Sequence, residues 1–208
     1  MSLIAKVHGG IYRRRVQRLG DELAPLFPRH ARVLDVGCGD GLLSSRIAQA
    51  RPDLEIQGIE VLERPRTFVP ISLFDGRTIP FPAASFDVVL FVDVLHHAAD
   101  PLALLREAAR VARQALVLKD HTRDGVLAGP TLRLMDWVGN ARHGVALPYN
   151  YWSRREWDEA FTTLGLTVEV WHSQLRLYPP PARPFFDRSL HFVTRLGVAP
   201  LPSAAVLS

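Results

Sequence analysis

A glycine-rich turn directly after an apolar run constrains the fold of this chain more than any other feature. The stretch VLDVGCGDG, residues 33–41, places three glycines at alternate positions. The run ARVLDV that leads into it is apolar and β-branched, and DGLLSSRIAQA after it has helical spacing. A strand, a tight glycine turn and a helix N-terminus present a cup of backbone N–H groups to a nucleotide-like ligand. The stretch therefore predicts the first ligand-binding unit of an α/β domain.

The residues up to 120 alternate between strand and helix patterns. Strands are expected at LEIQGIE, RTFVPISLF (weakened by Pro70), SFDVVLFVDVL and QALVLKD, and a helix with proline in its first turn at PLALLREAARVA. The nearly continuous apolar run SFDVVLFVDVL fits a parallel strand that is covered on both faces. Strands that alternate with helices predict a parallel sheet with right-handed crossovers.

The pattern changes at both ends of the chain. An amphipathic helix is expected over residues 11–26 and ends before Pro28. Beyond residue 120 we expect helices at GPTLRLMDWVG and SRREWDEAFTTLG, the second with a capping box of Ser153 and Glu156. LTVEVWHSQLRL and SLHFVTRL are predicted to be two late strands, and YPPPARP, residues 178–184, a stiff connector.

Composition narrows the class of protein. The chain has 208 residues, of which 48% are hydrophobic and 22% charged, which suits one domain with a proper core. No apolar run has the length of a membrane span, and no signal peptide is recognisable, so we expect a cytoplasmic protein with no membrane partner. The single cysteine, Cys38, excludes an internal disulfide framework and a cysteine-rich zinc site.

The net charge of +4 and the basic patch YRRRVQR, residues 12–18, raise the question of a nucleic-acid partner. Acidic residues are interspersed with the arginines everywhere else in the chain. A nucleic-acid partner is therefore not expected.

The glycine loop does not fit the two commonest nucleotide motifs. Gly37 and Gly39 match the start of the dinucleotide fingerprint G-x-G-x-x-G, but Leu42 occupies the position of its third glycine. No Gly-Lys-Ser/Thr follows, which excludes a P-loop.

The residues LDVGCGDG closely resemble motif I of the class I S-adenosylmethionine-dependent methyltransferases. Further landmarks of that family follow in order over residues 30–120: IQGIE, LFDG, IPFPAASFDVVL, VLHHAADP and REAARV. Within the family the chain is similar to the type 11 methyltransferases of ubiquinone and menaquinone biosynthesis. One departure is VLERPR, which is too short for the helix that usually follows the second strand.

The resemblance implies a Rossmann-like, doubly wound α/β fold with a mostly parallel seven-stranded sheet, an antiparallel last strand and an added N-terminal helix. It implies one methyltransferase domain, 1–208, with a helical cap (1–30), a cofactor-binding half (31–120) and a substrate-side insertion with the last strands (121–208). The expected oligomeric state is a monomer or a homodimer.

The resemblance also implies S-adenosylmethionine as cofactor and a set of residues that hold it. Glu60 would bind the ribose hydroxyls, Asp35 would lie near the ammonium, and Asp75 near the adenine. The full set is Asp35, Gly37, Cys38, Gly39, Glu60, Val61, Asp75, Gly76 and Asp93. The alternatives are that Asp35 only braces the turn, that Glu60 is an exposed acid at a strand end, and that Asp75 is a turn former before Gly76.

Methyl transfer depends mostly on proximity and alignment, and it needs a general base only if the acceptor must lose a proton. The candidate catalytic residues follow the fourth and fifth expected strands: His97, Asp120 and His121. The alternatives are that His96 and His97 pack near the cofactor and that Asp120 caps a helix or forms a salt bridge. No helical or hairpin spacing joins His97, Asp120 and His121, so we expect no metal site.

The segment 122–152 follows the fifth expected strand, where an acceptor pocket is typical. Its candidate lining residues, which are equally suited to the core, are Met135, Trp137, Tyr149, Tyr151 and Trp152. Tyr12 is a candidate for covering the cofactor, with packing as the equal alternative. The sequence thus predicts a small, apolar or aromatic acceptor. An enzyme that methylates RNA or protein, and a cofactor-binding protein without catalysis, remain as alternatives.

Overall fold

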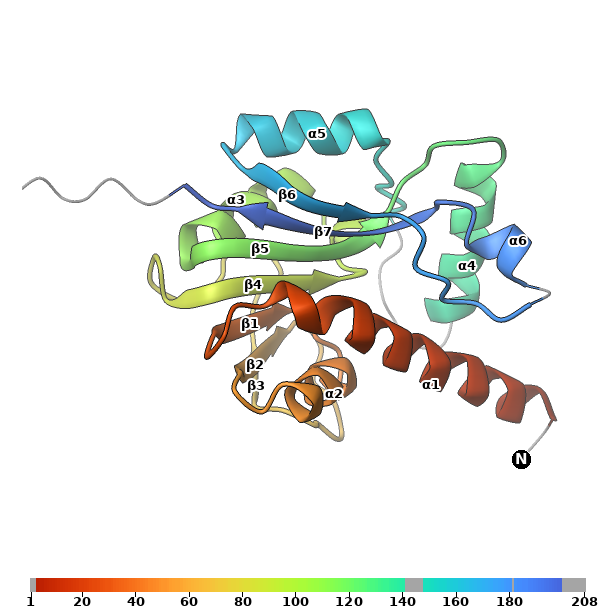
Figure 1. Cartoon of the computed structure of the whole chain (residues 1–208), viewed down its shortest axis with the longest axis horizontal. Coiled ribbons are helices and arrows are strands. Elements are labelled where there is room, and N and C mark those ends of the chain that lie inside the picture. The colour runs from red at the N-terminus through yellow and green to blue at the C-terminus, as the bar shows by residue number, and fades with distance from the viewer. Residues whose placement is uncertain (1–2, 141–147, 181, 200–208) are drawn as a thin grey trace, which may run out of the picture.

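The computed structural model of the chain describes residues 3–140, 148–180 and 182–199. Figure 1 shows a central sheet with helices on both faces. The strands are β1 (Arg32–Val36), β2 (Glu55–Glu60), β3 (Ile71–Leu73), β4 (Phe86–Val92), β5 (Ala112–His121), β6 (Thr167–His172) and β7 (His191–Gly197). The helices are α1 (Leu3–Leu23), α2 (Leu42–Ala50), α3 (Pro101–Val111), α4 (Ala128–Asn140), α5 (Arg154–Thr163) and α6 (Arg183–Phe186), with short 3₁₀ turns η1 (Ala24–Leu26) and η2 (Leu95–His97).

The sheet has seven strands in the order β3-β2-β1-β4-β5-β7-β6. All neighbours from β3 to β5 pair in parallel, whereas β7 runs antiparallel to both β5 and β6. This confirms the predicted Rossmann-like sheet with an antiparallel last strand in the chain. Because β1, β2, β4 and β5 are parallel, the residues at their carboxyl ends meet at one edge, where ligands of open α/β sheets bind.

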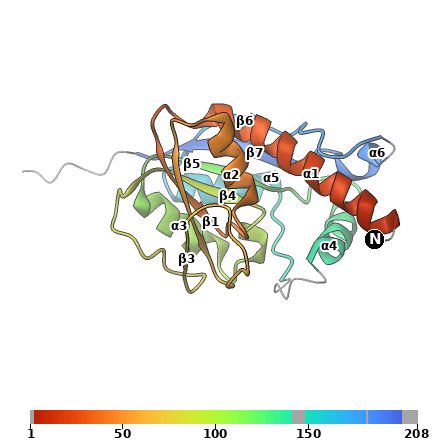
Figure 2. The ribbon, with the colours of Figure 1, turned by 90° about the horizontal axis from the view of Figure 1, so that it is seen from below.

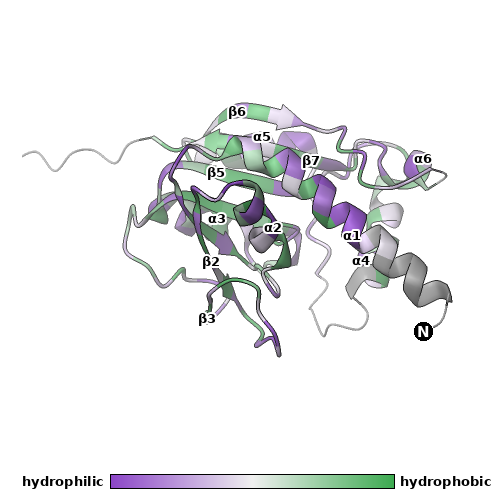
Figure 3. Ribbon diagram, turned by 60° about the horizontal axis from the view of Figure 1, so that its bottom comes forward, coloured by the Kyte–Doolittle hydropathy of each residue, from purple (hydrophilic) through white to green (hydrophobic). Residues whose placement is uncertain are grey.

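Two hydrophobic cores lie on opposite faces of the sheet because successive side chains of a strand alternate between its faces. Leu34, Phe91 and Leu118 pack with α3 and α5 in one core. Val33 and Val117 pack with α1 and α2 in the other core. Figure 2 shows α1 and α2 on one face of the strands, and in Figure 3 the central strand β5 is coloured hydrophobic. The predicted doubly wound arrangement is therefore present.

Several local predictions are confirmed and three need correction. The capping box is formed, since Ser153 Oγ accepts from the Glu156 backbone N–H and the Glu156 side chain accepts from the backbone N–H of Ser153. The strand expected at RTFVPISLF is only Ile71–Leu73, because Pro70 before it has no N–H to donate to a ladder. The connector expected over 178–184 already contains the start of α6 at Arg183.

The third correction concerns the N-terminal helix expected over 11–26. Its α-helical part begins earlier, at Leu3, and ends at Leu23, and the 3₁₀ turn η1 follows before Pro28. Within the described residues no helix is long and apolar enough to cross a membrane.

Candidate active site

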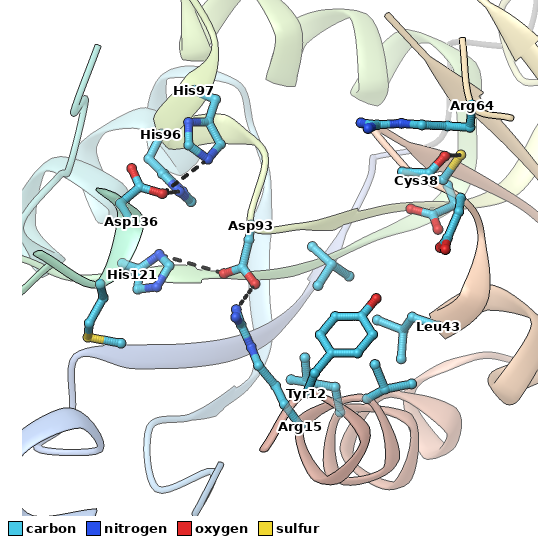
Figure 4. Close-up of a pocket in the computed structure, with 18 of the residues that line it drawn as sticks. Tyr12, Arg15, Cys38, Leu43, Arg64, Asp93, His96, His97, His121 and Asp136 are labelled. Carbon is cyan, nitrogen blue, oxygen red and sulfur yellow. Dashed lines mark hydrogen bonds and ion pairs between the residues drawn. The ribbon is translucent and has the colours of Figure 1, made fainter. Parts of the chain in front are cut away.

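A cavity of about 610 Å³ opens at the carboxyl edge of the sheet. Figure 4 shows side chains that point into it from the glycine loop, from α1, and from the segments after β4 and β5. The glycine-loop end of the cavity is lined by Asp35, Gly37, Cys38 and Gly39. Helix α1 contributes Tyr12, Arg15, Val16 and Leu19. The far end is lined by His96, His97, His121, Leu132, Met135, Asp136 and Tyr151. The cavity therefore joins the predicted cofactor loop to the predicted catalytic histidines.

The glycines of the loop are required by the backbone. Gly37, Gly39 and Gly41 have φ angles of +70°, +61° and +78°, which L side chains rarely adopt. A Cβ at Gly37 would lie 2.7 Å from Val94 Cγ2, whereas a Cβ at Gly39 would meet nothing within 4 Å. Gly37 thus permits close packing of the chain on itself, and Gly39 keeps the loop backbone open toward the cavity.

Asp35 lies at the end of β1, nearly inaccessible to solvent, and lines the cavity. Its Oδ2 accepts a hydrogen bond of 2.6 Å from Ser44 Oγ at the start of α2. Burial raises the pKa of Asp35 to about 7. Among the described residues no cationic side chain forms an ion pair with this carboxyl group. Asp35 is therefore a buried acid without a positive partner in the part of the chain that the structure describes.

Glu60, at the end of β2, holds the glycine loop in shape. Its Oε2 accepts from the Gly39 backbone N–H at 2.7 Å, and its Oε1 accepts from the Val61 N–H at 2.9 Å. Glu60 is buried, so it is not the exposed strand-end acid of the alternative interpretation. The carboxylate connects the ends of β1 and β2.

Asp75 and Gly76 form a turn beside the cavity and are not among the residues that line it. Asp75 Oδ1 accepts from the backbone N–H groups of Arg77 and Thr78, both at 2.7 Å. This is the geometry of a turn former, the alternative interpretation of this residue. Val61 is half exposed and lies against Gly76. No helix forms between β2 and β3, and Arg64, Pro65 and Arg66 of that segment border the cavity instead.

Cys38 packs under the loop. A Cβ at Gly58 of β2 would lie 2.3 Å from the Cys38 sulfur, so Gly58 is the residue that makes room for it. Burial raises the pKa of the Cys38 thiol well above its usual value. The thiol therefore stays protonated at neutral pH.

Asp93 follows β4 and anchors two cations. It forms ion pairs with Lys119 of β5, which is fully buried, and with Arg15 of α1. Burial favours the protonated acid, but the charges of Lys119 and Arg15 outweigh it and hold the pKa of Asp93 well below its usual range. Arg15 thereby ties α1 to the floor of the cavity (Figure 4).

Asp120 lies at the centre of a buried cluster of histidines and hydrogen-bonds to several of its groups. Its carboxylate accepts from His96 Nδ1 at 2.6 Å and from the backbone N–H groups of Leu95 and His121 at 3.2 and 2.8 Å. Burial opposes ionisation of Asp120, but His96 and His121 keep its pKa well below the usual range. His121 Nδ1 lies 3.3 Å from the same carboxylate. Asp120 itself does not line the cavity.

Two further groups complete the far end of the cavity. Asp136 of α4 lies with its Oδ1 3.4 Å from His97 Nε2 and 3.8 Å from His96 Nε2. Tyr151 Oη donates to Asp136 Oδ2 at 2.8 Å, and its ring stacks on His96. Burial lowers the pKa of His97, and its neighbour His96 adds to this effect.

The sequence matches a family described as a methyltransferase domain over residues 9–170, which is most of the chain. The chain belongs to this methyltransferase family. Its sheet order, its glycine loop and the acidic residues at the ends of β1 and β2 agree with the S-adenosylmethionine-dependent class I branch that the sequence predicted.

Curated relatives resemble part of this chain. Over 111 residues the chain is 38% identical to 27-O-demethylrifamycin SV methyltransferase of Amycolatopsis mediterranei, which covers 46% of this chain and 40% of that protein. Over 94 residues it is 35% identical to a ubiquinone biosynthesis O-methyltransferase of Hahella chejuensis, which covers 39% of each chain. The chain thus matches about two fifths of the length of these relatives.

Solved structures share the fold of this chain at low sequence identity. One of them is a chain from the complex between the Haloferax volcanii Trm112 methyltransferase activator and a putative methyltransferase. It superposes with a TM-score of 0.66 and 17% identity, and the match covers 90% of this chain and 91% of that chain. An S-adenosylmethionine-dependent methyltransferase of Mesorhizobium loti superposes with a TM-score of 0.62 and 18% identity, covering 85% and 96%.

The residues of this chain fit the cofactor of its family. S-adenosylmethionine carries an ammonium group, and Asp35 is a buried carboxyl group that borders the cavity and lacks a positive partner among the described residues. The open space above Gly39 lets the loop backbone approach a ligand. Asp35, Gly37 and Gly39 line the cavity and would hold the cofactor, whereas Glu60 is not among the lining residues and supports the loop through the Gly39 N–H.

Sequence reasoning missed Arg15 and Asp136. Arg15 belongs to the basic patch 12–18, yet its side chain faces the cavity together with Tyr12, Val16 and Leu19. The helical spacing of these four residues is a sequence signal that they share one face. Nothing in the sequence pointed to Asp136, because only the packing of α4 brings it to the histidines.

The predicted acceptor segment 122–152 lies partly at the cavity. Met135 and Tyr151 line it, Trp137 is exposed, Tyr149 packs near Tyr151, and Trp152 packs against Trp157 in the core. Residues 141–147 of this segment lie outside the described residues.

Proposed function

We propose that this methyltransferase moves the methyl group of S-adenosylmethionine to an oxygen of a small, apolar or aromatic acceptor. The observation that carries the proposal is that the glycine loop and the two histidines line the same cavity. The loop lies at one end of it, and His97 and His121 lie at the other. The similarity to O-methyltransferases of ubiquinone biosynthesis supports an oxygen as the acceptor atom.

The cofactor supplies a methyl group that its sulfonium centre already activates, so the chain mainly has to align the reactants. Gly37 and Gly39 allow the backbone approach, and Asp35 offers its carboxylate to the ammonium. In this proposal Glu60, which holds the loop, also binds the ribose hydroxyls. Asp93 and Arg15 fix α1 over the cavity.

An acceptor hydroxyl must lose its proton as the new bond to carbon forms. His97 and His121 are imidazoles at the acceptor end of the cavity, within reach of an acceptor bound there. Asp120 does not line the cavity and acts as a positioning residue, since it holds His96 and His121 in place. Met135 and Tyr151 contribute apolar surface for the acceptor.

Calorimetric titration with S-adenosylmethionine and with its product S-adenosylhomocysteine tests the cofactor half of this proposal. We expect binding in roughly the micromolar range, near −8 kcal/mol. Glu60→Ala removes the carboxylate that orders Gly39 and should weaken binding strongly. Glu159→Ala on the exposed side of α5 is the matched control and should bind like the wild type.

Absence of binding of both compounds to the folded wild-type protein would refute the proposal. Transfer of a labelled methyl group to a panel of phenols and other hydroxylated aromatic compounds then tests the acceptor half. Labelling of amines or thiols in preference to these hydroxyl compounds would contradict the assignment of an oxygen acceptor.

A further inference from the structure

Three potential metal ligands converge at the acceptor end of the cavity. His96 and His97 come from η2 after β4, and Asp136 comes from α4. One ligand atom from each of the three lies within 4.8 Å of the others. All three residues line the cavity, as Figure 4 shows for their side chains.

The hydrogen bonds around His96 leave its Nε2 as the ligand atom. The carboxylate of Asp120 can only accept, so the 2.6 Å contact requires that His96 Nδ1 carries the proton. The other ring nitrogen, Nε2, faces Asp136 and is the atom that an ion would coordinate once it displaces the proton there. An aspartate that orients a histidine in this way is the usual outer partner of a metal-binding histidine.

The carboxylate of Asp136 is oriented in the same manner. Tyr151 Oη donates to its Oδ2 at 2.8 Å, and its Oδ1 is the oxygen that faces both imidazoles. Each of these two ligands thus has an outer hydrogen-bond partner in the structure, which is the arrangement expected for a metal site.

The separations between the ligand atoms are compatible with atoms gathered around one ion. Asp136 Oδ1 lies 3.4 Å from His97 Nε2 and 3.8 Å from His96 Nε2. Protein N–H···O bonds are usually about 2.7–3.2 Å long. Two ligand atoms bound to one Zn²⁺ at about 2.0–2.1 Å in tetrahedral geometry lie about 3.3 Å apart.

We propose that His96, His97 and Asp136 bind a divalent transition-metal ion at the acceptor end of the cavity. Two imidazoles and one carboxylate suit Zn²⁺ and its first-row neighbours and are poor ligands for Mg²⁺ or Ca²⁺. Three protein ligands leave a coordination position that faces the cavity. If the proposed function holds, this position orients an acceptor oxygen toward the glycine-loop end, which makes hydroxyl compounds the preferred acceptors and leaves His121 as the imidazole that takes the acceptor's proton.

Calorimetric titration of the untagged, chelator-treated full chain with Zn²⁺ alone tests the site. We expect about one strongly bound ion per chain, as in other sites with three protein ligands. His97→Ala is the main variant because its side chain is partly accessible, so the fold should survive. Asp136→Asn is the second variant, and each should weaken Zn²⁺ binding by at least about 100-fold, since loss of even an outer partner costs about 10–100-fold.

His172→Ala is the matched control, because His172 lies on β6 with its side chain 58% exposed and away from the cavity. Asp120→Asn removes the carboxylate partner of His96 without removing a ligand, and it should weaken Zn²⁺ binding by about 10–100-fold. Co²⁺ should give a visible absorption band that persists in His172→Ala and disappears in His97→Ala.

Two outcomes would overturn the metal site. One is that the folded wild-type protein binds neither Zn²⁺ nor Co²⁺, and the other is that His97→Ala and Asp136→Asn bind Zn²⁺ as tightly as the control. Each sample is also titrated with S-adenosylhomocysteine. Cofactor binding without Zn²⁺ binding contradicts only the metal site, whereas Zn²⁺ binding without cofactor binding contradicts only the proposed function.

Discussion

The two ends of the cavity are built in different ways. The glycine-loop end consists of residues that are contiguous in sequence, and its shape comes from backbone angles and backbone N–H groups. The histidine end consists of side chains from α1, β5, α4 and the segment after β4, and its shape comes from buried charges. A backbone site depends on local conformation, whereas a side-chain site depends on the packing of distant elements.

This difference predicts how the two ends respond to substitution. Changes at the histidine end should act first on stability, because they leave buried charges without partners. Changes at the glycine loop should act on ligand binding as much as on stability, because the backbone itself faces the ligand.

The largest effect is expected from Asp93→Asn at the histidine end. The substitution leaves Lys119 and Arg15 without their carboxylate, and loss of one member of a buried ion pair destabilises a protein by about 3–5 kcal/mol. The free energy of unfolding in urea measures it. Asp158→Asn in the exposed Arg154–Asp158 pair of α5 is the control and should change stability by at most about 1 kcal/mol. Equal effects of both substitutions would contradict the assigned role of buried charge.

A pH-dependent effect of a few kcal/mol is expected at Asp35. Its pKa in the folded protein is about 7, above its ordinary value of 3.8, so between these values the folded state holds a proton that the unfolded state has lost. The Asp35 contribution to stability therefore falls as pH rises from about 4 to 7 and is constant above, with a slope of at most about 1.4 kcal/mol per pH unit.

The measurement is the difference in unfolding free energy between the wild type and Asp35→Asn at several pH values. The stability of the variant relative to the wild type should increase as pH rises to 7. The variant should also bind S-adenosylmethionine more weakly. A difference that does not change with pH would show that Asp35 is ionised throughout this range.

Smaller effects are expected from alanine substitutions at Gly37 and Gly39, and they should differ because the two glycines have different roles in the loop. Both Gly37→Ala and Gly39→Ala place a side chain at a left-handed φ, which costs about 1–2 kcal/mol. Gly37→Ala adds a clash with Val94 and should be the less stable variant. Gly39→Ala has free space but points its methyl group toward the ligand, so it should lose about tenfold in S-adenosylhomocysteine affinity, or 1.4 kcal/mol. The reverse ranking in stability would contradict this loop geometry.

The smallest effect is expected at Ser153→Ala, outside both ends. Loss of this helix cap costs about 1 kcal/mol of stability. Binding of S-adenosylhomocysteine and of Zn²⁺ should stay unchanged, because α5 packs on the sheet and does not line the cavity. A change in either binding constant would show that α5 is coupled to the site.

The parts of the site that could be predicted from the sequence are those that depend on neighbours in the chain. The glycine loop, the strand-end acids Asp35 and Glu60, and the cap at Ser153 each follow from a local pattern. Asp75 shows the limit of such reasoning, because its side chain is engaged in the turn that the Asp-Gly pair also predicted as the alternative.

Prediction failed where one residue depends on a distant one. Arg15 belongs to a basic patch in the sequence, but in the structure it pairs with Asp93. Asp136 lies near His97 only because α4 packs beside the segment after β4.

The sequence by itself determined the family, the order of strands and helices, and the position of the glycine loop, because periodicity and tight turns are encoded in adjacent residues. The tertiary structure decided which charges meet. Asp93 pairs with Arg15 and Lys119, Asp120 with His96, and Asp136 with His97. The physical reason is that electrostatic contacts between buried groups depend on distance in space, and only the packed sheet and helices set that distance.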